Sequence, residues 1–175
     1  DPGFQPSFLE GTIAGVDFMA NGQILVGGVG LRHQAVLGWK GRFRLNANGS
    51  LDTGFDQVVG SAGGVVRIWG EEYFFQRTTS GVVRCLLASG TGDYSYSTPY
   101  PEFAAGGGGF HIFPDGKQWR AGWHSKQQYD EEGNDIGSEP GYGLIQVLAD
   151  GNTDPDFDHK YTAPGRLTTI QETPD

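Results

Sequence analysis

The chain has 175 residues, 30 of them glycine, and a formal net charge of −9 at pH 7. Proteins that hold nucleic acids through the phosphate backbone need an excess of Lys and Arg, so this balance argues against a DNA or RNA partner. No stretch of 18 apolar residues occurs, which argues against membrane insertion in this segment. Helical apolar patterns are broken everywhere by Gly or Pro, so the chain is predicted to be all-β.

The N-terminal part contains a predicted β-hairpin. Residues 13–18 and 23–28 are expected to be strands, with a tight turn at Asn21-Gly22 between them. The second of these strands is almost wholly apolar, which favours a central position with both faces buried. Its Gly27-Gly28 pair would let a neighbouring backbone or bulky side chain approach closely, or would bend the strand.

A second hairpin follows at Asn48-Gly49, after a loop or irregular strand at residues 31–40. Residues 42–45 alternate polar and apolar side chains, as expected for a half-buried strand. Asn-Gly is typical of a two-residue type I′ turn, because both central positions need φ > 0. Asp52 can bond nearby amides to shape a further turn, and Phe55 then returns to an apolar environment. One repeat is therefore predicted to contain two hairpins and four strands.

The middle of the chain repeats this order with weaker turn signals. Residues 64–69, 72–76 and 81–87 are predicted strands. The single cysteine, Cys85, lies in the last of them and is expected to be a small buried hydrophobe.

The third unit has clearer turns and a long insertion. Residues 109–113 and 117–123 are predicted strands joined by Pro114-Asp115-Gly116, in which Pro presets φ for a turn. A polar, acidic insertion at residues 125–142 is expected to be a projecting loop, and residues 143–148 then lead into a hairpin at Asp150-Gly151.

The segment from Arg44 to Phe55 recurs along the chain. Residues 146–157 match it nearly position by position, residues 84–96 form a degenerate copy, and residues 1–4 match its end. The closing aromatic residues lie at positions 4, 55, 96 and 157, in steps of 51, 41 and 61 residues. An internal period of this length predicts a propeller or a solenoid.

These copies divide the chain into repeats. We assign residues 1–8 to the end of a preceding repeat, 9–56 to repeat 1, 57–98 to a degenerate repeat 2, 99–158 to repeat 3 with its insertion at 125–142, and 159–175 to the start of repeat 4. Because both ends fall inside a repeat, we expect the chain to be a fragment of a longer protein.

Two hairpin sequences in fixed order resemble the delta-60 repeat, a β-propeller-type repeat of large bacterial and phage surface proteins. The first hairpin is residues 20–28 and the second is residues 44–55, and residues 114–117 and 148–157 match in the third repeat. The middle repeat departs from the pattern, because it lacks both Asp-Gly turns and the closing Asp-x-x-Phe.

The resemblance implies an all-β fold of four-stranded antiparallel blades, about three of them and the start of a fourth. Neighbouring repeats or a second chain would then be needed to complete the array, since propellers usually have more blades. It implies no catalytic residues and no cofactor, because members of this family generally lack an assigned active site.

Alternating oxygen-bearing side chains follow the last hairpin turn, and they are the candidate calcium ligands Asp150, Asn152, Asp154 and Asp156. Their spacing resembles that of the oxygen ligands in calcium loops. The glycine and glutamate that complete an EF-hand loop are missing from the matching positions. The alternative is that these residues only shape the turns, as the sister copy at residues 48–55 suggests.

Two further groups could contact a glycan or a protein partner. Trp119 and Trp123 share a face of their predicted strand, where they could stack on sugar rings or pack against a neighbouring blade. Asp130, Glu131 and Glu132 lie in the insertion, which could bind a partner or simply be a solvated loop.

The sequence thus predicts a non-catalytic structural or recognition module of a larger extracellular, cell-surface or virion protein, such as a tail fibre. Its partners would be a protein or a glycan at a surface. The alternative is a glycan-binding or glycan-cleaving β-propeller, which should show two or three carboxylates converging in one pocket, about 5–10 Å apart.

Overall fold

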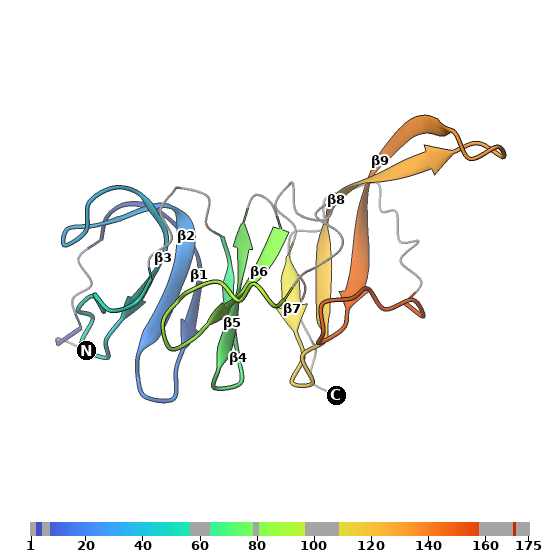
Figure 1. Cartoon of the computed structure of the whole chain (residues 1–175). Coiled ribbons are helices and arrows are strands. Elements are labelled where there is room, and N and C mark those ends of the chain that lie inside the picture. The colour runs from blue at the N-terminus through green and yellow to red at the C-terminus, as the bar shows by residue number, and fades with distance from the viewer. Residues whose placement is uncertain are drawn as a thin grey trace. The chain divides into compact units, whose positions relative to one another are not determined.

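The computed structural model describes residues 3–4, 8–56, 64–78, 81–96, 109–157 and 170, without the side chains of residues 8–9, 122–129 and 138–142. All regular structure in these residues is β, as predicted, and forms three antiparallel sheets of three strands each. The chain divides into two compact units, residues 1–96 and 97–175 (Figure 1). The described residues include no helix able to span a membrane.

The first sheet consists of β1 (Phe8–Phe18), β2 (Ile24–His33) and β3 (Lys40–Leu45), in that order. β2 is central, as its apolar sequence predicted, and Leu25 and Val26 bury opposite faces of it. The β1–β2 pairing extends further than expected, to Phe8 and His33. Gly11 and Gly30 make this possible, because their positive φ values accommodate the irregular register between the two strands.

The second sheet consists of β4 (Val66–Trp69), β5 (Tyr73–Thr78) and β6 (Gly81–Leu86). Its strands agree with the predicted ones to within a few residues. Cys85 is buried in the core of this unit, as expected for a small hydrophobe.

The third sheet, in the second unit, consists of β7 (Phe110–Ile112), β8 (Gln118–Tyr129) and β9 (Asp135–Val147). The prediction of a loop at residues 125–142 is wrong, because β8 and β9 remain paired out to Tyr129 and Asp135. Figure 1 shows this part as a two-stranded arm that continues beyond the sheet. The arm lacks the apolar alternation that reveals a half-buried strand, so the sequence did not indicate it.

The turns form where predicted, but their type differs. At Asn48-Gly49, Asn46 donates to Ser50 O and Gly49 donates to Asn46 O, which makes a three-residue loop. Gly49 has φ 87°, and no described non-glycine residue has positive φ, so the type I′ assignment is wrong. The geometry is a type I turn followed by a glycine bulge. Asn48 favours it through its side-chain oxygen, which accepts from the Ser50 N–H at 3.0 Å.

The same turn closes the hairpins at Gly22, Gly116, Gly133 and Gly151, each with positive φ. At each of them the side-chain oxygen of an Asn or Asp accepts a local backbone N–H, and these acceptors are Asn21, Asp115, Asp130 and Asp150. These residues are therefore used in turn formation.

Each sheet has three strands where four were expected. The segment that follows the last turn of each repeat pairs with the strand before that turn through a single β-bridge. These bridges join Leu45 with Leu51, Cys85 with Gly92, and Val147 with Thr153. A strand cannot continue there, because the following aspartate bends the chain into a turn of its own. Asp52, for example, accepts the Gly54 N–H at 3.0 Å.

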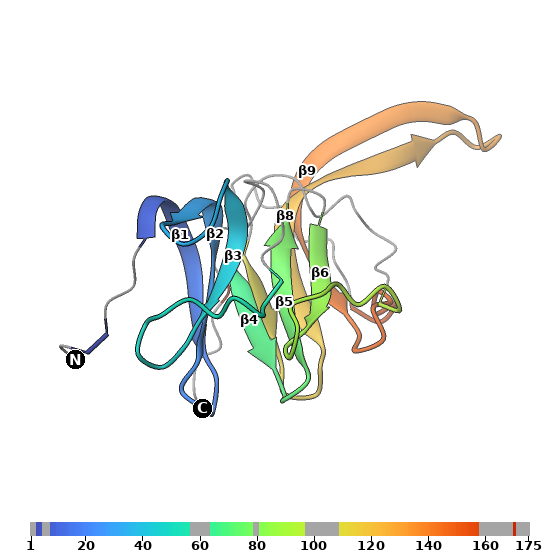
Figure 2. The same ribbon diagram turned by 60° about the vertical axis from the view of Figure 1, so that its left-hand side comes forward.

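The two sheets of the first unit pack side by side, with β1 and β4 adjacent (Figures 1 and 2). Leu25 and Phe55 of the first repeat share a buried cluster with Val66, Phe74 and Cys85 of the second. The packing is close at Gly27, where an added Cβ would lie 2.4 Å from Gly64 O. This confirms the predicted close approach at that glycine.

The strand at residues 42–45 is buried on both faces, whereas a half-buried strand was expected. Arg42 and Arg44 are 1% and 8% exposed, because the second sheet covers the face that carries them. The predicted start of repeat 4, residues 159–175, lies outside the described residues except for Ile170.

Candidate functional site

One structural feature recurs in all three repeats, and we call it the aspartate clamp. Its aspartates, Asp52, Asp93 and Asp154, each donate a backbone N–H at 2.9 Å to the carbonyl of a strand residue, which is Arg44, Arg84 or Gln146. The aspartate carbonyl then accepts the N–H of the closing aromatic residue three positions on, at 3.3–3.4 Å. The clamp therefore fixes where each aromatic side chain leaves the hairpin.

In the first two repeats the clamp is an ion pair. Arg44 places Nε and Nη2 at 2.8 Å from Oδ2 of Asp52. Arg84 places the same nitrogens at 2.8 and 2.7 Å from Asp93 Oδ2. In the third repeat the strand residue is neutral, and Gln146 Nε2 donates to Asp154 Oδ2 at 2.6 Å.

The hydrogen bonds of the clamp lower the pKa values of Asp52 and Asp93. Burial alone would raise the pKa of Asp52, but bonds from Arg44, the Gly54 N–H and Gln23 outweigh it and leave that pKa below its ordinary value. Bonds from Ser95 and Arg84 likewise lower the pKa of Asp93, against the effect of burial. Both carboxylates are therefore charged at neutral pH and hold their arginines in place.

The closing aromatic ring stacks on the clamp arginine. The guanidinium carbon lies 4.4 Å from the ring centroid in both pairs, Arg44 with Phe55 and Arg84 with Tyr96. The middle repeat therefore contains its predicted closing aromatic residue, although its sequence has tyrosine in place of the phenylalanine of the Asp-x-x-Phe pattern. Tyr96 supplies the ring, and it follows Asp93 by the same three positions.

The junction between the first two sheets depends on two arginines that cross it. Arg44 donates to Leu87 O, and Arg42 donates to Gln76 Oε1 and Gly90 O. Gln76 returns a bond to Gly41 O at 2.9 Å. Burial lowers the pKa of Arg42, while the Cys85 and Asp56 side chains act in the opposite direction. The sequence does not reveal these roles, although the two arginines stand two residues apart just before the turn.

The part of the chain that carries the first clamp has a recognisable family pattern. Residues 43–55 match a β-propeller family. Its description is "Domain of unknown function (DUF5122) beta-propeller". No curated protein matches the chain. The match to the β-propeller family spans the strand, the glycine turn, the clamp and the closing aromatic of repeat 1, which are the features that join its sheet to the next.

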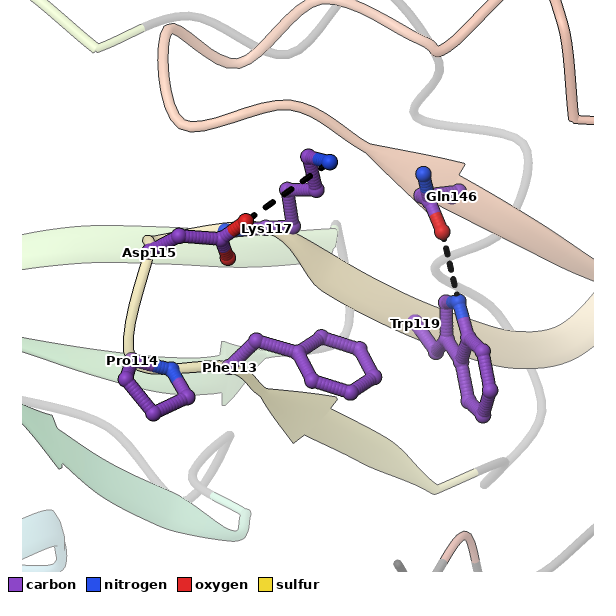
Figure 3. A pocket seen from close by; sticks show the side chains of 6 residues that line it. All are labelled: Phe113, Pro114, Asp115, Lys117, Trp119 and Gln146. Carbon is purple, nitrogen blue, oxygen red and sulfur yellow. Dashed lines mark hydrogen bonds and ion pairs between the residues drawn. The ribbon is translucent and has the colours of Figure 1, made fainter.

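A pocket of about 410 Å³ lies on the third sheet, at the position that corresponds to this junction (Figure 3). Its lining residues are Phe113, Pro114, Asp115, Lys117, Trp119 and Gln146. The Phe113 and Trp119 rings meet edge to face, with centroids 5.0 Å apart. Trp119 Nε1 donates to Gln146 Oε1 at 2.8 Å, so Gln146 links the indole to Asp154.

The candidate calcium ligands are engaged in turn formation. Asp150 accepts the backbone and side-chain N–H groups of Asn152 at 2.9 Å each, which lowers the pKa of Asp150. Asp154 accepts from Gln146 and from the Asp156 N–H. The described residues contain no group of three or more His, Cys, Asp or Glu side chains arranged to hold a metal ion.

The proposed contact residues are not brought together in one site. Trp119 is half-buried in the pocket, whereas the side chain of Trp123 lies outside the described set. Asp130 caps the turn of the arm by accepting the Asn134 N–H at 2.7 Å, and its hydrogen bonds with Asn134 lower its pKa. Glu131 and Glu132 are exposed at the same tip. Only one carboxylate, that of Asp115, lines the pocket.

Proposed function

We propose that this chain is a non-catalytic β-propeller-type repeat module, in which each repeat forms a blade. Its role is structural, because its most elaborate side-chain geometry joins one sheet to the next. The proposal also covers the larger protein that contains this module and where that protein acts. The module belongs to a delta-60-type protein that acts outside the cell, at a cell surface or on a virion, where it meets a protein or a glycan.

The junction of the first unit is the observation that supports this proposal. Two buried arginines of the first repeat end on carbonyls and an amide of the second, and an aromatic ring covers them. Buried charges are costly unless they are paired, so such residues are expected where a contact has to form in one geometry. The clamp itself, with its closing aromatic residue, recurs in the second and third repeats, as expected of a module built by adding blades.

The proposal predicts that the two sheets of the first unit unfold together. Phe74 is fully buried in β5 and packs on Phe55. Replacing it with alanine should cost about 3–5 kcal/mol, as for other buried phenylalanines. In native-state hydrogen exchange, the amides of β2 should then lose protection together with those of β5. The milder variant Phe74→Leu serves if the alanine variant does not fold.

The control for this experiment is Leu37→Ala, because Leu37 is 94% exposed. It should leave exchange in both sheets unchanged. If Phe74→Ala accelerates exchange in β5 and leaves β2 at the wild-type rate, the two sheets are independent and the proposed function is wrong.

A second candidate function, glycan binding, is favoured by the pocket on the third sheet. Trp119 offers an aromatic face, with Lys117, Asp115 and Gln146 as polar neighbours. Binding on a glycan array that disappears in Trp119→Ala and persists in Tyr94→Ala would support it, since Tyr94 is 96% exposed and lies outside the pocket. Absence of binding to every glycan by the wild type would count against it.

A further inference from the structure

The chain contains two Asn-Gly dipeptides, and their turns lie side by side. Both dipeptides follow an alanine, as Ala20-Asn21-Gly22 and Ala47-Asn48-Gly49. The first turn joins β1 to β2 (Figure 1), and a Cβ added to Gly22 would lie 3.2 Å from Ala47 Cβ. Asparagine is a chemically labile residue. It reacts most readily before glycine, because glycine has no side chain to hinder attack by its own main-chain nitrogen.

The reaction at such a dipeptide is deamidation through a cyclic imide. The glycine nitrogen loses its proton and bonds to the asparagine Cγ, and the side-chain nitrogen leaves as ammonia. Water then opens the ring, at Cγ to give aspartate or at the main-chain carbonyl to give isoaspartate. Either product has a carboxylate where the amide was, so an N–H donor is lost and a negative charge is gained.

The fold makes the two sites unequal. Asn21 and Gly22 are both exposed, whereas Gly49 is buried although Asn48 is exposed. Because the reaction begins when base from the solvent removes the proton of the glycine nitrogen, it is favoured at Gly22. The matching β4–β5 turn at Gly70 is exposed in the same way, although the first sheet packs beside it. Exposure of this turn is therefore compatible with a neighbouring sheet.

Asn21 is connected to the aspartate clamp through Gln23. Asn21 Nδ2 donates to Gln23 Oε1 at 2.9 Å. Gln23 Nε2 in turn donates to Asn46 Oδ1 and to Asp52 Oδ2, at 3.2 Å each. Against the effect of burial, this bond to Asp52 is among those that lower the pKa of the aspartate. The side-chain amide of Asn21 thus determines which end of Gln23 faces the clamp.

Two turns of the third repeat have an aspartate where the first repeat has asparagine. Asp150 accepts the side-chain amide of Asn152, two residues on, at 2.9 Å. Asp115 forms an ion pair with Lys117, also two residues on, in which Nζ lies 3.6 Å from Oδ2. In both turns the later residue directs a donor toward the aspartate. A carboxylate in the β1–β2 turn should likewise attract the nitrogen end of Gln23.

We propose that Asn21 is a deamidation site whose conversion weakens the aspartate clamp of the first repeat. Conversion reverses the amide of Gln23, so that its oxygen and not its nitrogen faces Asp52. Two acceptors then meet, and the carboxylate loses one of the donors that hold it. Asn48 is the matched site without this effect, because its oxygen accepts from the N–H and the hydroxyl of Ser50, as an aspartate oxygen could. This inference does not depend on the proposed function.

Incubation of the wild-type chain at mildly alkaline pH tests the reaction. Mass spectrometry of proteolytic peptides that contain Asn21 or Asn48 distinguishes the amide from the acid. In the folded chain Asn21 should convert first. In urea the two sites should convert at similar rates, because both follow alanine and neither glycine is then buried. Conversion of Asn48 as fast as Asn21 in the folded chain would overturn the proposal, and so would a folded chain that stays unconverted while the unfolded chain reacts.

Two matched variants test the effect on the clamp. Asn21→Asp should raise the pKa of Asp52, measured by NMR titration, because a donor is lost and a negative charge is added nearby. It should also lower the urea midpoint at pH 7. Asn48→Asp should leave both quantities unchanged. If Asn21→Asp leaves the pKa of Asp52 at its wild-type value, the proposal is wrong.

Gln23→Met tests the intermediate step, because methionine has a side chain of similar length and no amide. This variant should raise the pKa of Asp52 by itself. When Asn21→Asp is added to it, the further loss in urea midpoint should be smaller than the loss that Asn21→Asp causes in the wild type. An equal further loss would show that Gln23 does not transmit the effect, which would also overturn the proposal.

Discussion

Replacing Phe55 with alanine is expected to destabilise the first unit by about 3–5 kcal/mol, the range for large buried aromatic residues. Phe55 is 2% exposed, and its ring centroid lies 5.8 Å from that of Phe74 in the neighbouring sheet. The substitution removes apolar contact area and leaves a cavity at the centre of the junction. Because the ring also covers the Arg44 and Arg42 guanidiniums, its loss admits water to two buried cations.

Urea unfolding followed by fluorescence measures this effect as a lower midpoint with an unchanged slope. Tyr94→Ala is the matched control, since Tyr94 is an aromatic residue near the second clamp that is 96% exposed. It should change stability by no more than about 0.5 kcal/mol. Phe157→Ala should lie between the two, because Phe157 is only half-buried. Equal losses in all three variants would contradict the junction role of Phe55.

The features that were predictable from the sequence are those set by a few neighbouring residues. An Asn or Asp before Gly22, Gly49, Gly116 and Gly151 marked every one of these turns, because the side-chain bond and the positive φ are both local. The type of turn was missed, since a two-residue and a three-residue loop share the same dipeptide. The apolar run at residues 23–28 likewise marked β2 as a central strand.

The features that were not predictable depend on what another part of the chain covers. Arg42 and Arg44 alternate with Phe43 and Leu45, a pattern typical of a strand with one solvated face. That face is buried only because the second sheet lies on it and supplies Gln76 and two carbonyl groups. The arm of β8 and β9 was missed for a similar reason, because main-chain pairing holds it in register without an apolar pattern.

The candidate site shows the same division. The acidic residues at 150–156 have a spacing that suits either a cation or a pair of turns, and only the bonds to Asn152, Gln146 and the Asp156 N–H reveal their use. The closing aromatic of the middle repeat was predicted correctly as Tyr96, because the repeat spacing marks it although its sequence departs from Asp-x-x-Phe. Its stacking on Arg84 is visible only in the structure, since the pairing of the strands brings the two side chains together.

Arg44 and Asp52 are expected to show strong coupling in a double-mutant cycle. Each single alanine variant should lose about 1.5–3 kcal/mol, the range for hydrogen bonds to charged groups, since the side chains are 10% and 19% exposed. Arg44→Ala should be the more severe, because Arg44 also donates to Leu87 O and stacks on Phe55. The double variant should lose less than the sum, with a coupling energy of about 0.5–3 kcal/mol measured by urea unfolding.

The third repeat provides the internal comparison, because Gln146 replaces the arginine there. Coupling between Gln146 and Asp154 should be the smaller of the two, because only the carboxylate of that pair is charged, and a value equal to that of the ion pair would show that the arginine charge contributes nothing. Unfolding in acid independently tests whether the charge of Asp52 stabilises the pair. The pKa of Asp52 is lowered in the folded state, so the stabilisation is complete above the unfolded-state pKa of about 3.9 and is lost as the pH falls through the folded value. The Arg44–Asp52 coupling should therefore be present at pH 7 and disappear in strong acid, and coupling that persists there would mean that the pair is held by packing and not by charge.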